Sequence, residues 1–161
     1  MDTSETYIGM CEGAREIQAL KPDEDSKEGR DDHSYSSLFY LPVDEVFGLL
    51  HWDNDEGHWM IGDYHDNTDR AIWLPRQDQL QAMIKDKYFQ LGDMAYFFWS
   101  WIKSNIQVEL GLSSMEQLWL AFVMSEKFEK IWDGGKWQPD GTRLVVTEVP
   151  INYAPGRYRL S

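Results

Sequence analysis

Cysteine and long apolar segments are nearly absent from this chain. Its 161 residues include one cysteine, Cys11, which excludes an internal disulfide and favours a reducing compartment. No apolar run approaches the roughly 18 residues that a membrane-spanning helix needs. The acidic, polar N-terminus does not have the pattern of a signal peptide. We therefore expect a cytoplasmic protein, with residues 1–161 forming a single domain and Cys11 serving as a half-buried structural thiol rather than a nucleophile.

Basic residues are scarce in the first part of the chain. Residues 1–70 contain 18 Asp plus Glu against 5 Lys plus Arg, a net charge of −13, whereas residues 71–161 contain 10 of each. This balance argues against a general phosphate-neutralising surface and against attraction to anionic membranes. The acidic half could serve solubility, bind cations, or imitate nucleic acid towards a basic partner.

The strongest helical pattern runs from Ser113 to Gly134 and predicts the central core helix. Ser113 and Glu116 have the spacing of a capping box, and Gly134 suits the left-handed residue that ends a helix. The run Leu118–Met124 is apolar at every position and therefore covers the whole circumference. A helix of this kind must be covered on several sides.

The rest of the chain predicts an α+β fold, a small antiparallel β-meander packed on a few helices around the central buried helix. Tyr7, Met10, Ala14 and Ile17 recur at helical spacing. The other expected elements, in chain order, are a helix over 5–20, an acidic loop over 22–37, an edge strand over 38–41, strands over 46–53, 58–65 and 71–74, helices starting at Pro75 and over 94–106, a strand over 144–149, and an irregular tail from about 150.

The segment from Val46 to His65 has the pattern of a β-hairpin and carries the best candidate for a metal site. A turn at residues 54–57 would pair Asp53 with His58. Strand alternation then places Phe47, Leu49, His51 and Asp53 on one face, opposite a core face that includes Val46 and Ile61. Two imidazoles and a carboxylate suit zinc or another divalent metal. Asp63 and His65 could form a second half-site on the opposite face. The alternatives are a solvated polar face, a structural or incidental metal, and a catalytic metal.

Two longer motifs carry a resemblance. WLPRQDQLQ at residues 73–81 and SMEQLWLAFVM at residues 114–124, together with YIGMCE at residues 7–12, resemble a family of small proteins encoded by phages and prophages of Gram-positive bacteria. The resemblance implies an accessory phage product in the bacterial host cytosol that acts on host machinery or host defence. It implies no catalytic residues.

Three functions agree with these observations. The first is a non-enzymatic inhibitor that binds a host-defence nuclease, such as a CRISPR nuclease, in its basic nucleic-acid-binding groove, without binding nucleic acid or membrane itself. Its expected interaction residues are acidic: Asp53, Asp55, Glu56, Asp63 and Asp66. The second is a metal-binding protein or metal-dependent enzyme that uses His51, Asp53 and His58. The third is a phage structural or assembly component.

The stretch from Phe97 to Trp101 adds a second candidate surface. It contains four large aromatic rings in five positions, on a helix expected to pack against the central one. These rings cannot all face inward, so we expect one or two of them in an exposed patch that binds a partner.

Overall fold

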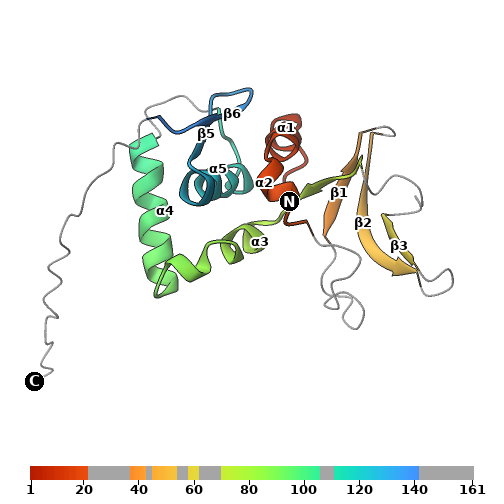
Figure 1. The fold of residues 1–161 in the computed structure, drawn as a ribbon, viewed down its shortest axis with the longest axis horizontal. Helices are drawn as coiled ribbons and strands as arrows, with labels where there is room; N and C mark the ends of the chain where they lie inside the picture. Colours follow the sequence, from red (N-terminus) through yellow and green to blue (C-terminus); the bar gives the residue numbers. More distant parts are fainter. Residues whose placement is uncertain (22–36, 43–44, 54–57, 62–69, 106–110, 142–161) are drawn as a thin grey trace, which may run out of the picture.

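The computed structural model describes residues 1–21, 37–42, 45–53, 58–61, 70–105 and 111–141, with only the backbone described for 50–53 and 58–60 (Figure 1). The elements are α1 (Glu5–Gly13), α2 (Arg15–Gln18), β1 (Leu38–Leu41), β2 (Val46–Asp53), β3 (His58–Ile61), β4 (Ile72–Leu74), α3 (Gln77–Ala82), the 3-10 helix η3 (Lys85–Lys87), α4 (Leu91–Asn105), α5 (Met115–Phe128), β5 (Lys130–Trp132) and β6 (Trp137–Pro139). The expected α+β fold is confirmed.

The larger sheet is antiparallel and has the strand order β3-β2-β1-β4. Strands β1, β2 and β3 follow one another as a meander, and β4 returns to pair with β1, which is the order of a Greek key. Strand β1 is therefore an interior strand and not the edge strand that Pro42 suggested. Pro42 follows the strand, so its missing N–H removes no hydrogen bond from the ladder.

The hairpin of β2 and β3 has the expected register. Asp53 pairs with His58, and His51 pairs with Met60. On this register Ile61 belongs to the core face and is buried, whereas Phe47 and Leu49 belong to the opposite face and are exposed. The predicted alternation is thus confirmed at the described side chains.

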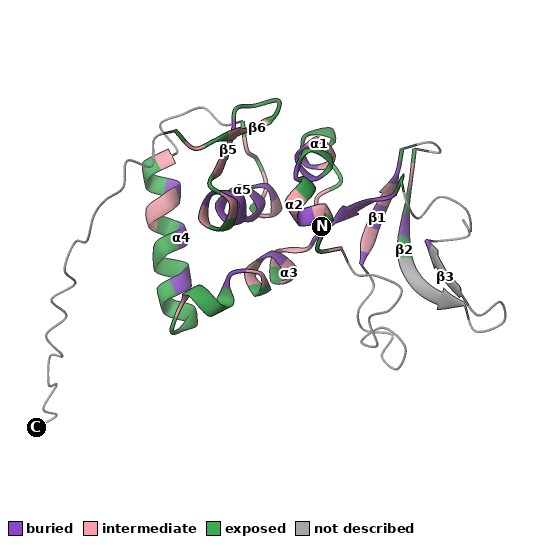
Figure 2. Cartoon of the chain, in the orientation of Figure 1, coloured by how far each residue is buried: buried purple, intermediate pink, exposed green. Residues whose placement is uncertain are grey.

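Helix α5 is the central helix, as expected, but it is shorter than predicted. The seven consecutive residues Trp119–Ser125 are all buried, and α3, α4, α1 and β5 surround the helix (Figures 1 and 2). The N-cap is Ser114, whose hydroxyl accepts a hydrogen bond from the Gln117 N–H at 3.1 Å, one residue later than the Ser113 capping box.

The predicted end of this helix at Gly134 is wrong. The helix stops at Phe128 because Glu129 adopts the left-handed conformation, with φ 54°. The following residues form strand β5, whose β-branched and aromatic side chains favour extended backbone. Gly134, with φ 97°, lies instead in the turn between β5 and β6, where the Asp133 carboxylate accepts hydrogen bonds from two backbone N–H groups.

Helices α1 and α2 link the other helices to the larger sheet. The predicted face of Tyr7, Met10, Ala14 and Ile17 is fully buried, although the helix is interrupted at Ala14. The Gln18 side-chain amide donates to the Trp73 carbonyl and accepts from the Trp73 N–H, at 3.0 and 2.9 Å. Gln18 therefore occupies the outer edge of β4 in the way that a neighbouring strand would.

Helix α4 packs on α5 through a single stripe of residues. Met94, Phe98 and Ile102 are buried, and the Phe98 ring stacks on Trp119 with 3.9 Å between the ring centroids. The remaining surface of α4 is mostly exposed (Figure 2). This confirms the expected contact between the aromatic helix and the central helix.

Among the described residues, no helix combines the length and the apolar character that a membrane crossing would require. The expected acidic loop at 22–37 (apart from Ser37), the strand at 144–149 and the tail from about 150 lie outside the described residues. Pro75 precedes α3 by two residues and is not its first residue, because Arg76 takes the N-cap position.

We expect α5 to determine the stability of the fold. Trp119→Ala or Phe122→Ala should lower the free energy of unfolding by about 3–5 kcal/mol, because each leaves a cavity in a closely packed core. Chemical denaturation measures the change. Trp99→Ala on α4 is the matched control, since Trp99 is exposed, and it should cost less than about 1 kcal/mol. Unchanged midpoints in both core variants would contradict the central role of α5.

Candidate binding surfaces

The backbone of the β2–β3 hairpin has the register that the predicted metal site requires. His51 and Asp53 lie two residues apart on β2, and Asp53 is directly paired with His58 on β3. Paired residues in an antiparallel ladder have Cα atoms about 4.5–5.5 Å apart, a spacing compatible with shared metal ligation. The side chains of all three residues lie outside the described part, so the site stays a prediction. Among the side chains that are described, no group of three or more His, Cys, Asp or Glu could hold a metal ion.

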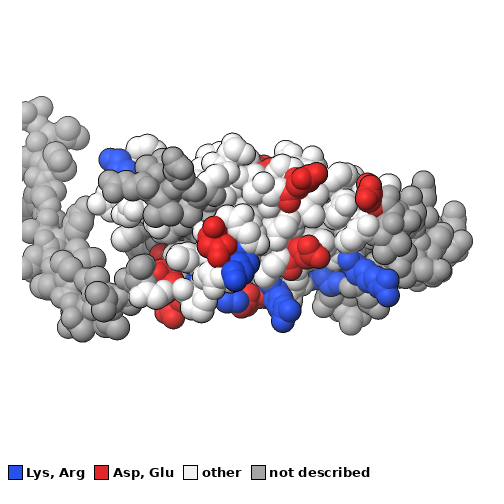
Figure 3. All heavy atoms as spheres, turned by 90° about the horizontal axis from the view of Figure 1, so that it is seen from above, with Lys and Arg blue, Asp and Glu red and all other residues white. Residues whose placement is uncertain are grey.

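The other predicted acidic interaction residues fall outside the described residues: Asp55, Glu56, Asp63 and Asp66, and likewise His65. The described residues contain 14 Asp plus Glu and 10 Lys plus Arg, a net charge of −4 out of the total of −13. On the face shown in Figure 3, acidic and basic side chains are interspersed. Most of the negative charge of the chain therefore belongs to the segments outside the described residues.

An apolar patch lies on one face of the sheet, within the acidic half of the sequence. Two cross-strand pairs form it, Leu38 with Leu49 and Tyr40 with Phe47, and the rings of Tyr40 and Phe47 are 5.2 Å apart. Phe47 is 43% exposed and Leu49 is 46% exposed. We call these four residues the sheet patch. The sequence pattern predicts that His51 and Asp53 follow on the same face of the strand.

A second exposed apolar surface lies on α4, as the aromatic sequence predicted. Tyr96 is 67% exposed and Trp99 is 56% exposed, and the Lys103 ammonium lies 5.3 Å from the Trp99 ring centroid. Phe97 is also exposed, but its ring lies 5.5 Å from the half-buried Tyr88. Sequence reasoning missed Phe89, which precedes the helix and is 93% exposed.

Two buried side chains among the described residues, Cys11 and Tyr7, carry ionisable groups, and both are structural. Cys11 is fully buried, more deeply than the half-buried position expected, and burial raises the pKa of its thiol. Burial likewise raises the pKa of Tyr7, whose hydroxyl donates a hydrogen bond to the Pro75 carbonyl. A neutral, inaccessible thiol is a poor nucleophile, so Cys11 is a packing residue, as expected.

The polar residues at the start of α3 act locally. The Gln79 side chain accepts a hydrogen bond from the Arg76 N–H at 2.8 Å and donates one to Ser37. The Arg76 guanidinium pairs with the Asp78 carboxylate at 2.9 Å. These contacts fix the helix start, which agrees with a capping role.

Asp2 connects the amino ends of two helices, and sequence reasoning missed it. Its carboxylate accepts hydrogen bonds from the Ser114 hydroxyl at 2.5 Å and from the Gln117 amide at 2.8 Å, at the start of α5. It also accepts the Ser4 N–H at 2.8 Å, beside the N-cap of α1. A carboxylate is favourable here because both helix dipoles are positive at this end. The sequence feature that indicated a helix start here was Ser4, an N-cap residue type directly before an amphipathic helix.

No protein-family model, curated protein sequence or solved structure matches this chain. The candidate surfaces therefore rest on the chain's own residues.

We expect Asp2 to contribute stability that depends on pH. Partial burial raises the pKa of Asp2, but the hydrogen bonds from Ser114, Ser4 and Gln117 outweigh it and hold the pKa below 3.8. A lowered pKa stabilises the fold above the unfolded-state pKa, and this stabilisation is lost as pH falls through the folded-state pKa. Asp2→Asn should therefore cost about 1 kcal/mol near neutral pH, measured by denaturation.

The same measurement in acid provides the control. The difference between Asp2→Asn and the parent should shrink as pH falls below about 4, where the parent carboxyl becomes protonated. A difference that stays constant across this range would contradict a role for the carboxylate charge.

Proposed function

We propose that this chain acts by binding a basic protein, as a phage-encoded inhibitor of a host nuclease that handles nucleic acid. The phage setting comes from the sequence resemblance. The observation that carries the proposal is the exposed sheet patch in the half of the chain that holds all of the net negative charge. The proposed partner carries a groove lined by Lys and Arg, with apolar side chains that meet Phe47 and Leu49.

The sheet patch supports this proposal because it combines the two properties of a specific interface. Protein interfaces have an apolar, desolvated centre and a polar rim, and aromatic residues such as Phe47 and Tyr40 are enriched at such centres. Asp53 lies on β2 four residues after Leu49, so the apolar patch leads directly into the predicted acidic residues. Apolar contact would supply affinity, and charge would supply orientation and a fast association rate.

The described residues support a binding function better than they support catalysis. The single thiol is buried with a raised pKa. Ion pairs such as Asp78 with Arg76 and Glu16 with Lys130 fix local structure. A binding function needs no further group, whereas an enzyme would have to assemble its site from residues outside this set.

We expect an acidic variant series to test the proposal. Neutralising Asp53, Asp55, Glu56 and Asp66 to Asn or Gln should slow association with a purified guide-loaded CRISPR nuclease by about tenfold or more at low salt. The parent should displace DNA from the nuclease, and its binding should weaken as salt rises and the screening length falls below about 10 Å. Surface binding kinetics and a DNA competition assay measure both effects.

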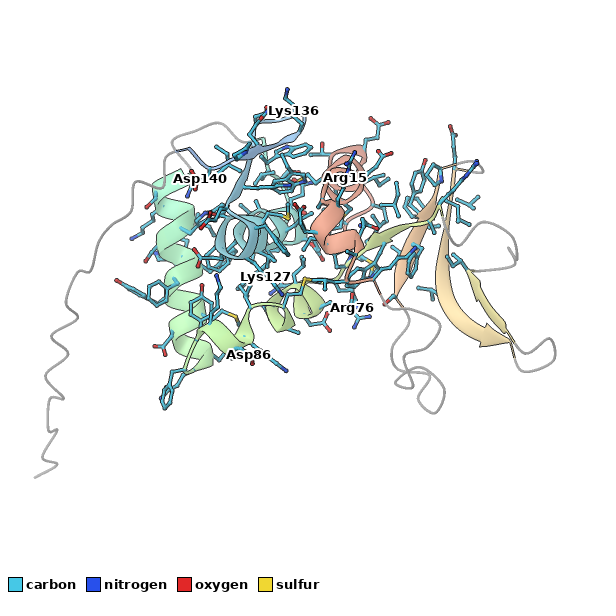
Figure 4. All side chains as sticks on the ribbon, viewed as in Figure 1. Arg15, Arg76, Asp86, Lys127, Lys136 and Asp140 are labelled. Atoms are coloured by element: carbon cyan, nitrogen blue, oxygen red, sulfur yellow. The ribbon has the colours of Figure 1, made fainter. Side chains whose placement is uncertain are left out.

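The matched control neutralises four acids of the electrically balanced half, Asp86, Glu109, Glu129 and Glu148, and changes the net charge equally. We expect this variant to retain most of the parent's association rate, because position and not total charge directs docking. Figure 4 labels Asp86 below α5, away from the sheet. Equal slowing in both variants, or DNA that stays bound to the nuclease, would contradict the proposal.

A second candidate function is metal binding at the hairpin. The observation that favours it is the pairing of Asp53 with His58, with His51 two residues away on β2. Two imidazoles and a carboxylate would suit zinc or another divalent ion, held with a fourth ligand from outside this set. Such an ion could fix the hairpin that extends the proposed binding face, or supply a Lewis acid.

We expect untagged protein to bind at most one equivalent of zinc or a similar ion, and the combined change His51→Ala and His58→Ala to abolish this binding. Elemental analysis after equilibration at about micromolar zinc, in the range of a weak protein site, measures it. His33→Ala is the control and should leave the stoichiometry unchanged. Metal-free parent protein under these conditions would end the metal hypothesis and the enzyme hypothesis with it.

A further inference from the structure

The outward surface of α4 has a regular pattern that neither the fold nor the proposed function uses. The buried stripe of the helix is Met94, Phe98 and Ile102. On the opposite side lie Gly92, Tyr96, Trp99 and Lys103, all of them exposed. We call these four residues the outer seam. Side chains project from α4 on the side away from α5 (Figure 4).

The spacing of the outer seam is that of helices that pair with one another. Its residues are separated by four, three and four positions, the alternation of the contact positions in a two-helix coiled coil. Tyr96 and Trp99 occupy the centre, and Gly92 and Lys103 occupy the two ends. A glycine at one end leaves room for a long side chain opposite. Apart from the two adjacent residues and the backbone of α4 itself, no atom of the described residues lies within 4 Å of a Cβ built on Gly92.

We propose that this seam binds a second copy of the same chain, with the two α4 helices antiparallel across a two-fold axis. In this arrangement Tyr96 of each copy lies across from Trp99 of the other, and Gly92 lies across from Lys103. A two-fold contact uses the same surface on both copies, so the surface must be complementary to itself. The proposal is independent of the nuclease-inhibitor function, because it uses a different surface.

Charge selects the antiparallel direction. Asp93 lies beside the seam at the amino end of α4, and Lys103 lies on it at the carboxyl end. Both are exposed. Antiparallel pairing brings each Lys103 close to the Asp93 of the other copy, whereas parallel pairing would bring like charges together. The Lys103 ammonium already lies near Trp99, at the level where the opposite helix would pass.

The distribution of charge also favours a second copy over a strongly charged partner. Residues 71–161, which include α4, carry equal numbers of acidic and basic residues. The strands of the larger sheet lie at the other end of the molecule from α4 (Figure 1). Pairing through α4 therefore keeps the two larger sheets far apart.

The size of the seam predicts a weak, reversible dimer. An aromatic side chain offers roughly 150–250 Å², so the exposed parts of Tyr96, Trp99 and the neighbouring Phe89 amount to about 400 Å² per copy. The two copies together would bury about 800 Å², below the roughly 1,200 Å² of standard specific interfaces and typical of transient ones. We therefore expect dimers at high protein concentration and monomers on dilution.

Sedimentation velocity on the full chain over a wide concentration range tests the proposal. The parent should shift from monomer to dimer, and Trp99→Ala should move the midpoint of this shift to at least tenfold higher concentration. Phe47→Ser on the sheet patch is the control and should leave the midpoint unchanged. A parent that stays monomeric at the highest concentration, or a Trp99→Ala variant that dimerises like the parent, would overturn the proposal.

Charge exchange tests the antiparallel direction. Asp93→Lys and Lys103→Asp should each dimerise more weakly than the parent, because each places like charges at both ends of the pair. An equimolar mixture of the two variants should dimerise more strongly than either alone, since opposite charges then meet at both ends of the mixed pair. Asp86→Lys, the control for net charge, should dimerise like the parent. A mixture no stronger than its components would overturn the antiparallel pairing.

Discussion

The constraint on which the structure depends is the need to cover a helix that is apolar on every side. Seven consecutive buried residues, Trp119–Ser125, present side chains around the full circumference of α5. The chain meets this need with α4, α3, α1 and the β5–β6 hairpin placed around α5 (Figure 1). Because these helices are used to cover α5, the outward surface of α4 and one part of the sheet stay open, and both carry exposed apolar side chains.

Patterns that repeat over many residues predicted the fold well. The face of Tyr7, Met10, Ala14 and Ile17, the strands at 38–41 and 46–53, the Asp53–His58 register and the central helix all agree with the structure. Structural features that depend on the backbone conformation of a single residue could not be predicted. The left-handed backbone at Glu129 ends α5 early, although Glu is an ordinary helix residue. The return of β4 to β1 is a tertiary feature that no local pattern indicates, and the residue after β4, Pro75, is bonded to Tyr7, 68 positions away.

The candidate surfaces likewise separate into features that local sequence patterns predicted and features that depend on tertiary contacts. Sequence placed Phe47 and Leu49 on the outward face and expected exposed rings on the aromatic helix, because alternation and crowding are local properties. It did not identify Asp2, whose role appears only when the amino ends of α1 and α5 meet. The two surfaces have different character. The sheet patch lies in the half of the chain that holds the net charge, and the outer seam of α4 lies in the neutral half.

The contact between Gln18 and Trp73 has a consequence for how this chain behaves in concentrated solution. An outer strand with unpaired N–H and C=O groups is a template on which another chain can add a strand, and ordered aggregates grow in this way. At Trp73 both groups are already bonded to a side-chain amide of the same molecule. Growth of the sheet beyond β4 would first have to remove an internal partner, so the amide acts as a barrier to polymerisation while leaving the helical surfaces free for reversible contacts.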